Sequence, residues 1–178
     1  MAEYSLSFSH MGFFVRDLEK MVVFYRDVLG FFLTDQGWLG PRELRFLSRD
    51  PSEHHQIVLM TGRGEEQETT INQISFRVAT LEELCIVYAR LVAADIPNLD
   101  PATHGNAWSV YFPDPEGNRI EVYTDSQWFI TQPHKVPVDL SRPAVDLRAE
   151  NEAMCRMMPG FKPISEWHAD MRALMGMA

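Results

Sequence analysis

The sequence predicts an α+β protein: two βαβββ modules that form a curved mixed sheet around a cleft, followed by a C-terminal helical arm. Three observations predict this fold. Strand-like and helix-like patterns follow in the order strand, helix, strand, strand, strand, and that order occurs twice, about 60 residues apart. After Asp125 prolines interrupt the chain. We expect a domain over 1–125, with modules over about 5–61 and 71–125, and an arm over 126–178.

The first module begins with an aromatic and β-branched segment at 7–15, which is typical of a strand. A helix follows, capped by Asp17 or a neighbour, and Gly30 is a natural residue to end it. Its apolar residues recur at helical spacing, which predicts one buried face: Leu18, Met21, Val22, Tyr25 and Val28. The remaining predicted strands are Phe31–Thr34, Leu44–Ser48 and Gln56–Thr61.

The second module follows the polar linker 62–70 and repeats this order. Thr80 is expected to cap its helix, and Pro97 and Pro101 indicate a loop with at most a short strand. The segment Asp114–Asn118, DPEGN, has the composition of a tight turn. The predicted elements are a strand at Asn72–Val78, a helix at Leu81–Ala94, and strands at Trp108–Phe112 and Arg119–Thr124.

The arm is extended around its prolines and then helical at Arg148–Met157 and Ser165–Met177. Its many methionines suit packing onto an irregular surface. We expect it to cover the domain or a dimer partner, with a lid over the cleft as the alternative. Trp128 and Phe129 could add to an apolar interface, so we expect a homodimer.

Composition excludes several classes of function. The net charge of −9 and the lack of a basic run argue against nucleic-acid and anionic-membrane binding. No apolar run approaches the ~20 residues that span a bilayer, and no signal peptide is apparent. Cys85 and Cys155 are too far apart to indicate a metal pair or a disulfide framework. We expect a reduced cytoplasmic protein.

His10 and Glu121 are the first candidate metal ligands. His10 lies on the first predicted strand, and Glu121 lies on the last, where Ile120 and Val122 alternate with it. If those two apolar residues pack under the helices, the carboxylate faces the cleft. The repeat places both residues at strand positions that should converge. Two histidines and one carboxylate are the usual ligands of non-haem ferrous iron.

Two segments resemble the vicinal oxygen chelate superfamily, which includes glyoxalase I, fosfomycin-resistance enzymes, bleomycin-binding proteins and extradiol dioxygenases. SHMGFFVRDLEKMVVFYRDVLGF looks like its opening, and FPDPEGNRIEVY looks like its closing motif. The resemblance covers roughly residues 5–125. It implies metal ligands at His10, Gln73 and Glu121.

Further matches resemble one-domain extradiol enzymes. A histidine ends the first module, here His54 or His55, and we take His55 as the acid/base group. An H-x-N element gives His104 as a catalytic residue and Asn106 as a substrate contact. Tyr111 lies ten residues before Glu121 and would hydrogen-bond bound oxygens, while Trp108 would offer an aromatic face to the substrate.

The resemblance therefore implies a metal-dependent extradiol dioxygenase of the biphenyl-2,3-diol 1,2-dioxygenase kind, acting on a small catecholic aromatic with dioxygen. The metal would be Fe(II), with Mn(II), Ni(II) or Zn(II) as alternatives. Gln73 departs from the family pattern, because extradiol enzymes have histidine there; some glyoxalase I enzymes use glutamine. Gln73 either binds the metal or leaves the site too weak for iron.

Two other functions stay open. One is a different metalloenzyme, such as a glyoxalase-like isomerase or lyase. Glyoxalase I has an extra Glu ligand where this chain has Ile57–Leu59, and no cationic cluster of the fosfomycin type is seen in module two. The other is a non-catalytic protein that binds a small molecule such as a drug, which the net charge of −9 fits.

Overall fold

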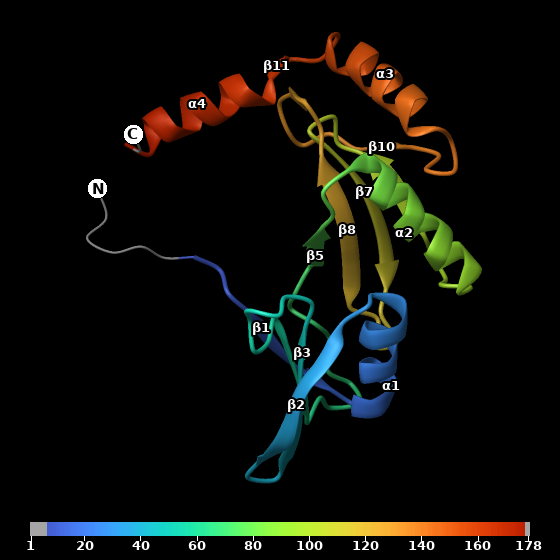
Figure 1. Cartoon of the computed structure of the whole chain (residues 1–178), viewed down its shortest axis with the longest axis vertical. Coiled ribbons are helices and arrows are strands. Elements are labelled where there is room, and N and C mark those ends of the chain that lie inside the picture. Colours follow the sequence, from blue (N-terminus) through green and yellow to red (C-terminus); the bar gives the residue numbers. More distant parts are fainter. Residues whose placement is uncertain (1–6, 177–178) are drawn as a thin grey trace. The chain divides into compact units, whose positions relative to one another are not determined.

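The computed structural model describes residues 7–176, in which the chain forms two compact units (Figure 1). Of these residues, the N-terminal unit contains 7–72 and 113–118, and the C-terminal unit contains 73–112 and 119–176. Both combine helices with a mixed sheet, which confirms the α+β class. Residues 5, 6 and 177, which belong to predicted elements, lie outside the described part.

The N-terminal unit has one four-stranded sheet in the order β1-β4-β3-β2. The first and last strands, β1 and β4, are parallel, and the other neighbours are antiparallel. Apolar side chains of the sheet and its helix form the core, including Val15, Met21, Tyr25, Leu47 and Leu59. The elements are β1 (Met11–Val15), α1 (Leu18–Val23), η1 (Phe24–Val28), β2 (Phe32–Leu39), β3 (Arg42–Ser48) and β4 (Ile57–Thr61).

Local chemistry sets the bounds of α1. The Asp17 carboxylate accepts a hydrogen bond from the Lys20 backbone N–H at 3.0 Å, so Asp17 is the N-cap. The predicted helix is longer than α1 alone, because a π-helical turn, η1, continues it. Gly30 then adopts a left-handed φ of 73°, which favours glycine and ends the helical segment.

The C-terminal unit repeats the topology of the first one. Its sheet has the order β10-β6-β7-β8-β5, in which β5 pairs parallel with β8 just as β1 pairs with β4. The internal repeat is thus present as two modules of the same strand order. The elements of this module are β5 (Ile74–Arg77), α2 (Leu81–Ala93), β6 (Asp100–Thr103), β7 (Ala107–Pro113) and β8 (Arg119–Asp125).

Helix α2 covers one face of this sheet. Thr80 caps the helix, since its hydroxyl accepts from the Glu83 backbone N–H at 3.2 Å. Ile120 and Val122 of β8 are buried, and α2 contacts β8. Side chains alternate along a strand, so Glu121 lies on the opposite face from these two residues. The sheet therefore separates an apolar face from a polar face.

The arm belongs to the C-terminal unit and has more structure than the sequence indicates. Two short strands, β9 and β10, precede its helices and a third, β11, lies between them; β10 pairs with β6 at the sheet edge. Helix α3 lies beside α2 (Figure 1), with which it is in contact. No residue of α4 is buried. None of the helices described between residues 7 and 176 has the length and apolarity needed to cross a membrane. The elements are β9 (Trp128–Phe129), β10 (Val136–Pro137), α3 (Ala144–Cys155), β11 (Lys162–Pro163) and α4 (Ile164–Leu174).

Candidate metal centre and substrate site

Glu121 is a buried carboxylate on the polar face of the C-terminal sheet, with 7% of its surface exposed. Oε1 accepts a hydrogen bond from the Ser109 hydroxyl at 2.7 Å, and Oε2 accepts one from the Ser75 hydroxyl at 2.5 Å. The strand register explains the second contact, because Ser75 lies directly opposite Glu121 across β5 and β8. Strands on both sides therefore fix the orientation of the carboxylate.

Gln73 lies just before β5 and completes the set of donors around Glu121. Its Nε2 donates to Oε2 of Glu121 at 2.8 Å and to the Ser75 hydroxyl at 3.0 Å. A carboxylate only accepts, so the amide nitrogen has to face it. The amide oxygen, Oε1, accepts no hydrogen bond from another residue of the described chain. Gln73 thus has an oxygen available for a cation next to Glu121.

His104 and Tyr111 form a second polar pair on the same unit. Nε2 of His104 lies 2.8 Å from the Tyr111 hydroxyl, and Nδ1 lies 2.7 Å from the backbone oxygen of His134. A carbonyl oxygen only accepts, so Nδ1 carries a proton. In the neutral imidazole, Nε2 then accepts the Tyr111 proton. Burial, followed by the nearby Glu121 carboxylate, raises the pKa of Tyr111 to about 12.

The segment after β8 holds the loop that carries His104. The Gln132 amide donates to the His104 backbone oxygen at 2.8 Å, and the Asn106 side chain accepts from the Ile130 N–H at 2.8 Å. Gly105, between them in the H-x-N element, has a φ of 76° and no room for a Cβ against Ile130. Asn106, expected from the sequence to touch substrate, binds the backbone of the arm.

In the N-terminal unit, His10 and His55 lie together. Their ring centroids are 4.3 Å apart in an edge-to-face arrangement. His10 immediately precedes β1 and is not part of it, unlike the sequence expectation. Nδ1 of His55 lies 2.8 Å from Nδ1 of His54, whose other ring nitrogen is 3.5 Å from Asp35. Burial, then repulsion by His10 and His54, lowers the pKa of His55.

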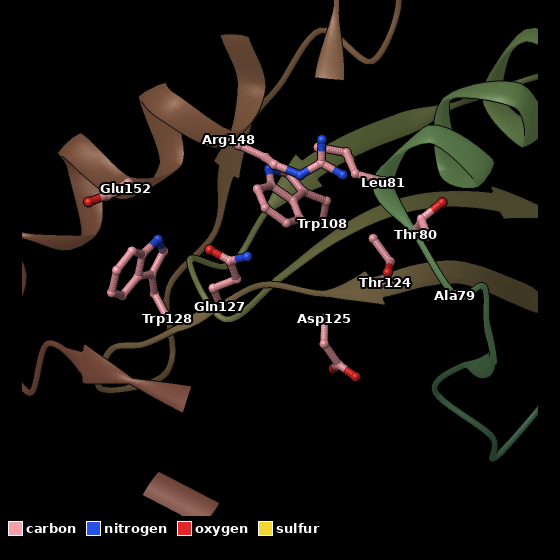
Figure 2. Close-up of a pocket in the computed structure, with 10 residues that line it drawn as sticks. All are labelled: Ala79, Thr80, Leu81, Trp108, Thr124, Asp125, Gln127, Trp128, Arg148 and Glu152. Carbon is pink, nitrogen blue, oxygen red and sulfur yellow. The ribbon is translucent and has the colours of Figure 1, made fainter. Parts of the chain in front are cut away.

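Trp108 lies on the other face of the C-terminal sheet from Ser109 and Tyr111, because side chains alternate along β7. It lines a pocket of about 180 Å³ together with Leu81 and Arg148 (Figure 2). Its indole N–H is buried without a hydrogen-bond partner. Trp108, predicted from the sequence to contact the substrate, therefore lies on the opposite face of the sheet from Glu121.

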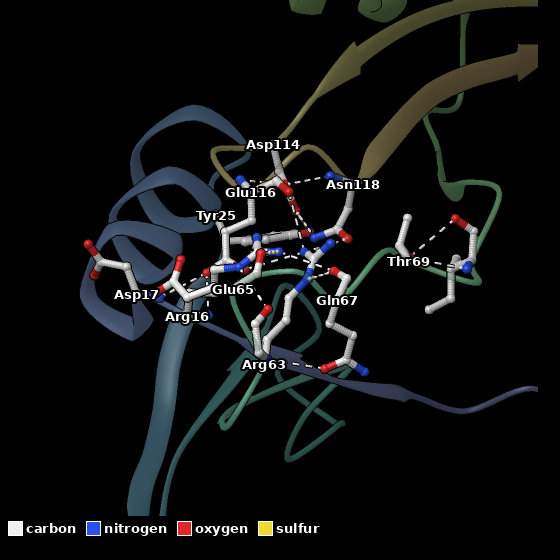
Figure 3. A network of polar contacts seen from close by, with 12 residues as sticks. Arg16, Asp17, Tyr25, Arg63, Glu65, Gln67, Thr69, Asp114, Glu116 and Asn118 are labelled. Atoms are coloured by element: carbon white, nitrogen blue, oxygen red, sulfur yellow. Dashed lines mark hydrogen bonds and ion pairs between the residues drawn. The ribbon is translucent and has the colours of Figure 1, made fainter.

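A separate polar network fixes the DPEGN turn within the N-terminal unit (Figure 3). Oε1 of Glu116 accepts from the backbone N–H groups of Arg16 and Asp17, at 2.5 and 2.9 Å. Oε2 forms ion pairs with Arg16 and Arg63. Asp114 starts the turn by accepting from the N–H of Asn118. This network is structural and contains none of the predicted site residues.

Four residues of the polar face escaped the sequence analysis. Ser75 and Ser109 contact Glu121, and Arg119 and Lys135 lie over the Tyr111 ring, with Arg Cζ and Lys Nζ at 4.1 and 4.9 Å from its centroid. A signal existed for three of them: Ser75, Ser109 and Arg119 each lie two residues along a predicted strand from a predicted site residue, namely Gln73, Tyr111 and Glu121. Nothing in the local sequence marks Lys135.

The donor chemistry of the proposed ligands fits a divalent cation. His10 offers an imidazole nitrogen, Gln73 an amide oxygen and Glu121 a carboxylate oxygen. Among residues 7–176, no three His, Cys, Asp or Glu side chains form a metal-binding group. Gln73 adds an amide next to Glu121, with its nitrogen hydrogen-bonded to the carboxylate.

Two curated dioxygenases are similar to this chain. Biphenyl-2,3-diol 1,2-dioxygenase 3 of Rhodococcus globerulus is 29% identical over 124 residues, 66% of this chain and 63% of that protein. Catechol-2,3-dioxygenase of Bacillus subtilis (strain 168) is 32% identical over 127 residues, 66% of this chain and 42% of that protein. The chain spans less than two thirds of the length of either relative.

Solved structures share the fold. A glyoxylase/bleomycin resistance protein/dioxygenase domain from Frankia sp. EAN1pec superimposes with a TM-score of 0.58 at 23% identity, covering 68% of this chain and 99% of that one. FosX of Listeria monocytogenes complexed with Mn(II) and sulfate gives 0.50 at 20% identity, covering 71% and 95%. A family model matches residues 7–122. The chain therefore belongs to the Glyoxalase/Bleomycin resistance protein/Dioxygenase superfamily.

Proposed function

We propose that this protein is a metal-dependent extradiol-type dioxygenase that cleaves a catecholic ring. The observation that carries the proposal is the polar face of the C-terminal unit, where Gln73 binds Glu121 and His104 binds Tyr111. The names of the two dioxygenase relatives support it. In the reaction, both atoms of dioxygen enter the product, and one ring bond next to a hydroxyl-bearing carbon breaks.

His10, Gln73 and Glu121 would hold the metal, for which Fe(II) is the first candidate and Mn(II), Ni(II) and Zn(II) are alternatives. When bound, a divalent metal would lower the pKa of the diol and bring it beside dioxygen. Ser75 and Ser109 hold the Glu121 carboxylate in one orientation through its two oxygens. Ligands that are held by other residues lose less freedom on binding.

The remaining residues would manage protons. Tyr111 keeps its proton at neutral pH, as tyrosine ordinarily does, and its pKa of about 12 extends this to more alkaline pH, so it stays a hydrogen-bond donor. His104 fixes the Tyr111 hydroxyl through Nε2. The lowered pKa of His55 favours its neutral imidazole form, which would accept a proton from the diol.

The test is turnover by metal-loaded protein. The full chain is purified anaerobically, loaded with Fe(II), Mn(II), Ni(II) or Zn(II) in turn, and mixed with catechol or 2,3-dihydroxybiphenyl under oxygen. We expect a yellow ring-opened product with Fe(II) or Mn(II), and at least a hundredfold less with Glu121→Ala, since one metal ligand is lost. Oxygen uptake is measured in parallel.

Metal affinity separates this function from the alternatives. If no divalent metal binds, the dioxygenase and any other metalloenzyme of the superfamily are both excluded, and a small-molecule binding protein remains. If metal binds through Glu121 but no diol is cleaved, a glyoxalase-like isomerase or lyase becomes the better assignment. Glu150→Ala, on the surface of α3, serves as the matched control and should bind metal like the wild type.

A further inference from the structure

Two cationic side chains lie over the ring face of Tyr111, in a chain whose net charge is −9. Arg119 Cζ lies 4.1 Å and Lys135 Nζ lies 4.9 Å from the centroid of its ring. Both cations are within salt-bridge distance of one carboxylate, that of Asp100. The cluster of Arg119, Lys135 and Asp100, here called the Tyr111 cationic patch, therefore has one positive charge in excess.

The hydrogen-bonding capacity of the patch is also incomplete. Lys135 hydrogen-bonds Asp100, but Arg119 approaches that carboxylate only to 3.8 Å. The Arg119 guanidinium donates no hydrogen bond to another residue of the described chain. A guanidinium has five N–H donors in a planar fork, whose geometry matches a carboxylate in a bidentate arrangement. The guanidinium thus has donors available for a ligand.

The patch lies on the same sheet face as Glu121. Arg119 and Glu121 are two residues apart on β8, and side chains two apart on a strand share a face. Tyr111 joins the two, because its ring contacts both cations and it shares a face of β7 with Ser109, whose hydroxyl donates to Glu121. A ligand that reaches the Tyr111 hydroxyl therefore comes close to the patch.

Lys135 comes from outside the family region. The family model matches residues 7–122, whereas Lys135 lies in the arm, next to β10. Pairing of β10 with β6 brings this part of the arm beside the module, and the neighbouring His134 carbonyl binds His104. The arm thus adds a positive charge beside Tyr111, and this charge does not come from the superfamily module.

We infer that the substrate of this protein is an aromatic diol that carries a carboxylate, which Arg119 and Lys135 bind beside Tyr111. This inference deepens the proposed function and rests on it. The excess positive charge attracts an anion, and the fork of Arg119 orients it. Both cations are about 40% exposed, so solvent screening limits the preference to roughly tenfold.

The experiment compares each acid with its neutral amide of nearly equal size. The probes are 2,3- and 3,4-dihydroxybenzoate and the corresponding dihydroxybenzamides. Dissociation constants are measured anaerobically on the metal-loaded full chain, and kcat/KM is then measured under oxygen. We expect one acid to bind about tenfold more tightly than its amide. Arg119→Gln and Lys135→Glu should reduce or reverse that ratio, and Lys162→Gln, on the arm but away from the patch, should keep it.

The two measurements separate the two proposals. A preference for the acid that depends on both cations, with no ring cleavage, supports the patch and overturns the dioxygenase function. Ring cleavage with equal affinities for acid and amide supports the dioxygenase function and overturns the patch. A preference that survives both Arg119→Gln and Lys135→Glu also overturns it. Circular dichroism of each variant checks that the fold is kept.

Discussion

The amide nitrogen of Gln73 donates a 2.8 Å hydrogen bond to Oε2 of Glu121. This contact joins the residue that departs from the extradiol pattern to the carboxylate that the superfamily resemblance identifies as a ligand. Because the nitrogen is used by the carboxylate, only the amide oxygen of Gln73 is available to a metal. An amide oxygen is a weaker ligand for ferrous iron than an imidazole nitrogen.

Replacing Gln73 with histidine should therefore strengthen iron binding. We expect Gln73→His to lower the dissociation constant for Fe(II) by tenfold or more, measured by anaerobic competition with a chelator. Gln127→His is the matched control, since Gln127 lines the pocket behind the sheet and should not change the affinity. Equal affinities of Gln73→His and the wild type would mean that residue 73 is not at the metal.

Much of the fold follows from local sequence patterns. Apolar spacing and capping residues predict helices α1 and α2. As expected, the side chains of Asp17 and Thr80 accept hydrogen bonds from backbone N–H groups in the first turn of each helix. The repeat predicts the shared strand order of the two modules, because both copies have the same succession of strand and helix patterns. The arm is different. Its strand β10 exists only because β6 offers an edge to pair with, and no local pattern encodes that partner.

The placement of a site residue could be predicted where it depends only on the alternation of side chains along one strand. Alternation along β7 puts Trp108 on the opposite face of the sheet from Tyr111, and this placement follows from the strand pattern alone. Contacts between segments that are distant in the sequence could not be predicted in this way. Lys135 reaches Tyr111 through pairing of the arm with the module, so its role depends on the tertiary fold.

Ser109 provides a test of how Glu121 is held. Its side chain is fully buried and donates to Oε1 of Glu121 at 2.7 Å. Ser109→Ala leaves a buried carboxylate oxygen with one donor fewer, which should cost about 1–3 kcal/mol of unfolding free energy in urea. Ser165→Ala, on the exposed side of α4, should change it by less than about 0.5 kcal/mol. Equal stability of both variants would show that water replaces the hydroxyl at no cost.

The ion pair of Glu82 with Arg148 can be tested through the pH dependence of stability. Its two carboxylate oxygens accept from Arg148, each at 2.6 Å, and this hydrogen bonding lowers the pKa of Glu82 from 4.5 to about 2. A carboxyl whose pKa is lowered by folding stabilises the protein above its unfolded pKa. That contribution is lost as the pH falls from about 4.5 towards 2.

Removing Arg148 should return the pKa of Glu82 towards 4.5, as followed by NMR titration of the side-chain carboxyl. The stability difference between wild type and Arg148→Gln should shrink on acidification through the same range. Arg142→Gln breaks another surface pair of α3 and should leave the Glu82 titration unchanged. A Glu82 midpoint that does not move in Arg148→Gln would contradict the ion pair between α2 and α3.

Glu116 should be the most sensitive position of the DPEGN turn. Only 5% of its side chain is exposed, and its partner Arg63 is 9% exposed, so the pair is shielded from solvent. Glu116→Ala leaves Arg63 buried without this partner and removes the acceptor of the Arg16 and Asp17 N–H groups. Loss of one member of a buried ion pair costs about 3–5 kcal/mol.

Denaturation in urea distinguishes the charge of Glu116 from its hydrogen bonds. Glu116→Gln keeps an oxygen that can accept from a backbone N–H but removes the charge, so its loss of stability should be smaller than that of Glu116→Ala. Glu53→Ala, at an exposed position of the same unit, is the control and should stay within about 0.5 kcal/mol of the wild type. If Glu116→Ala matched that control, the turn would be held by Asp114 alone, whose carboxylate accepts from the Glu116 and Asn118 N–H groups.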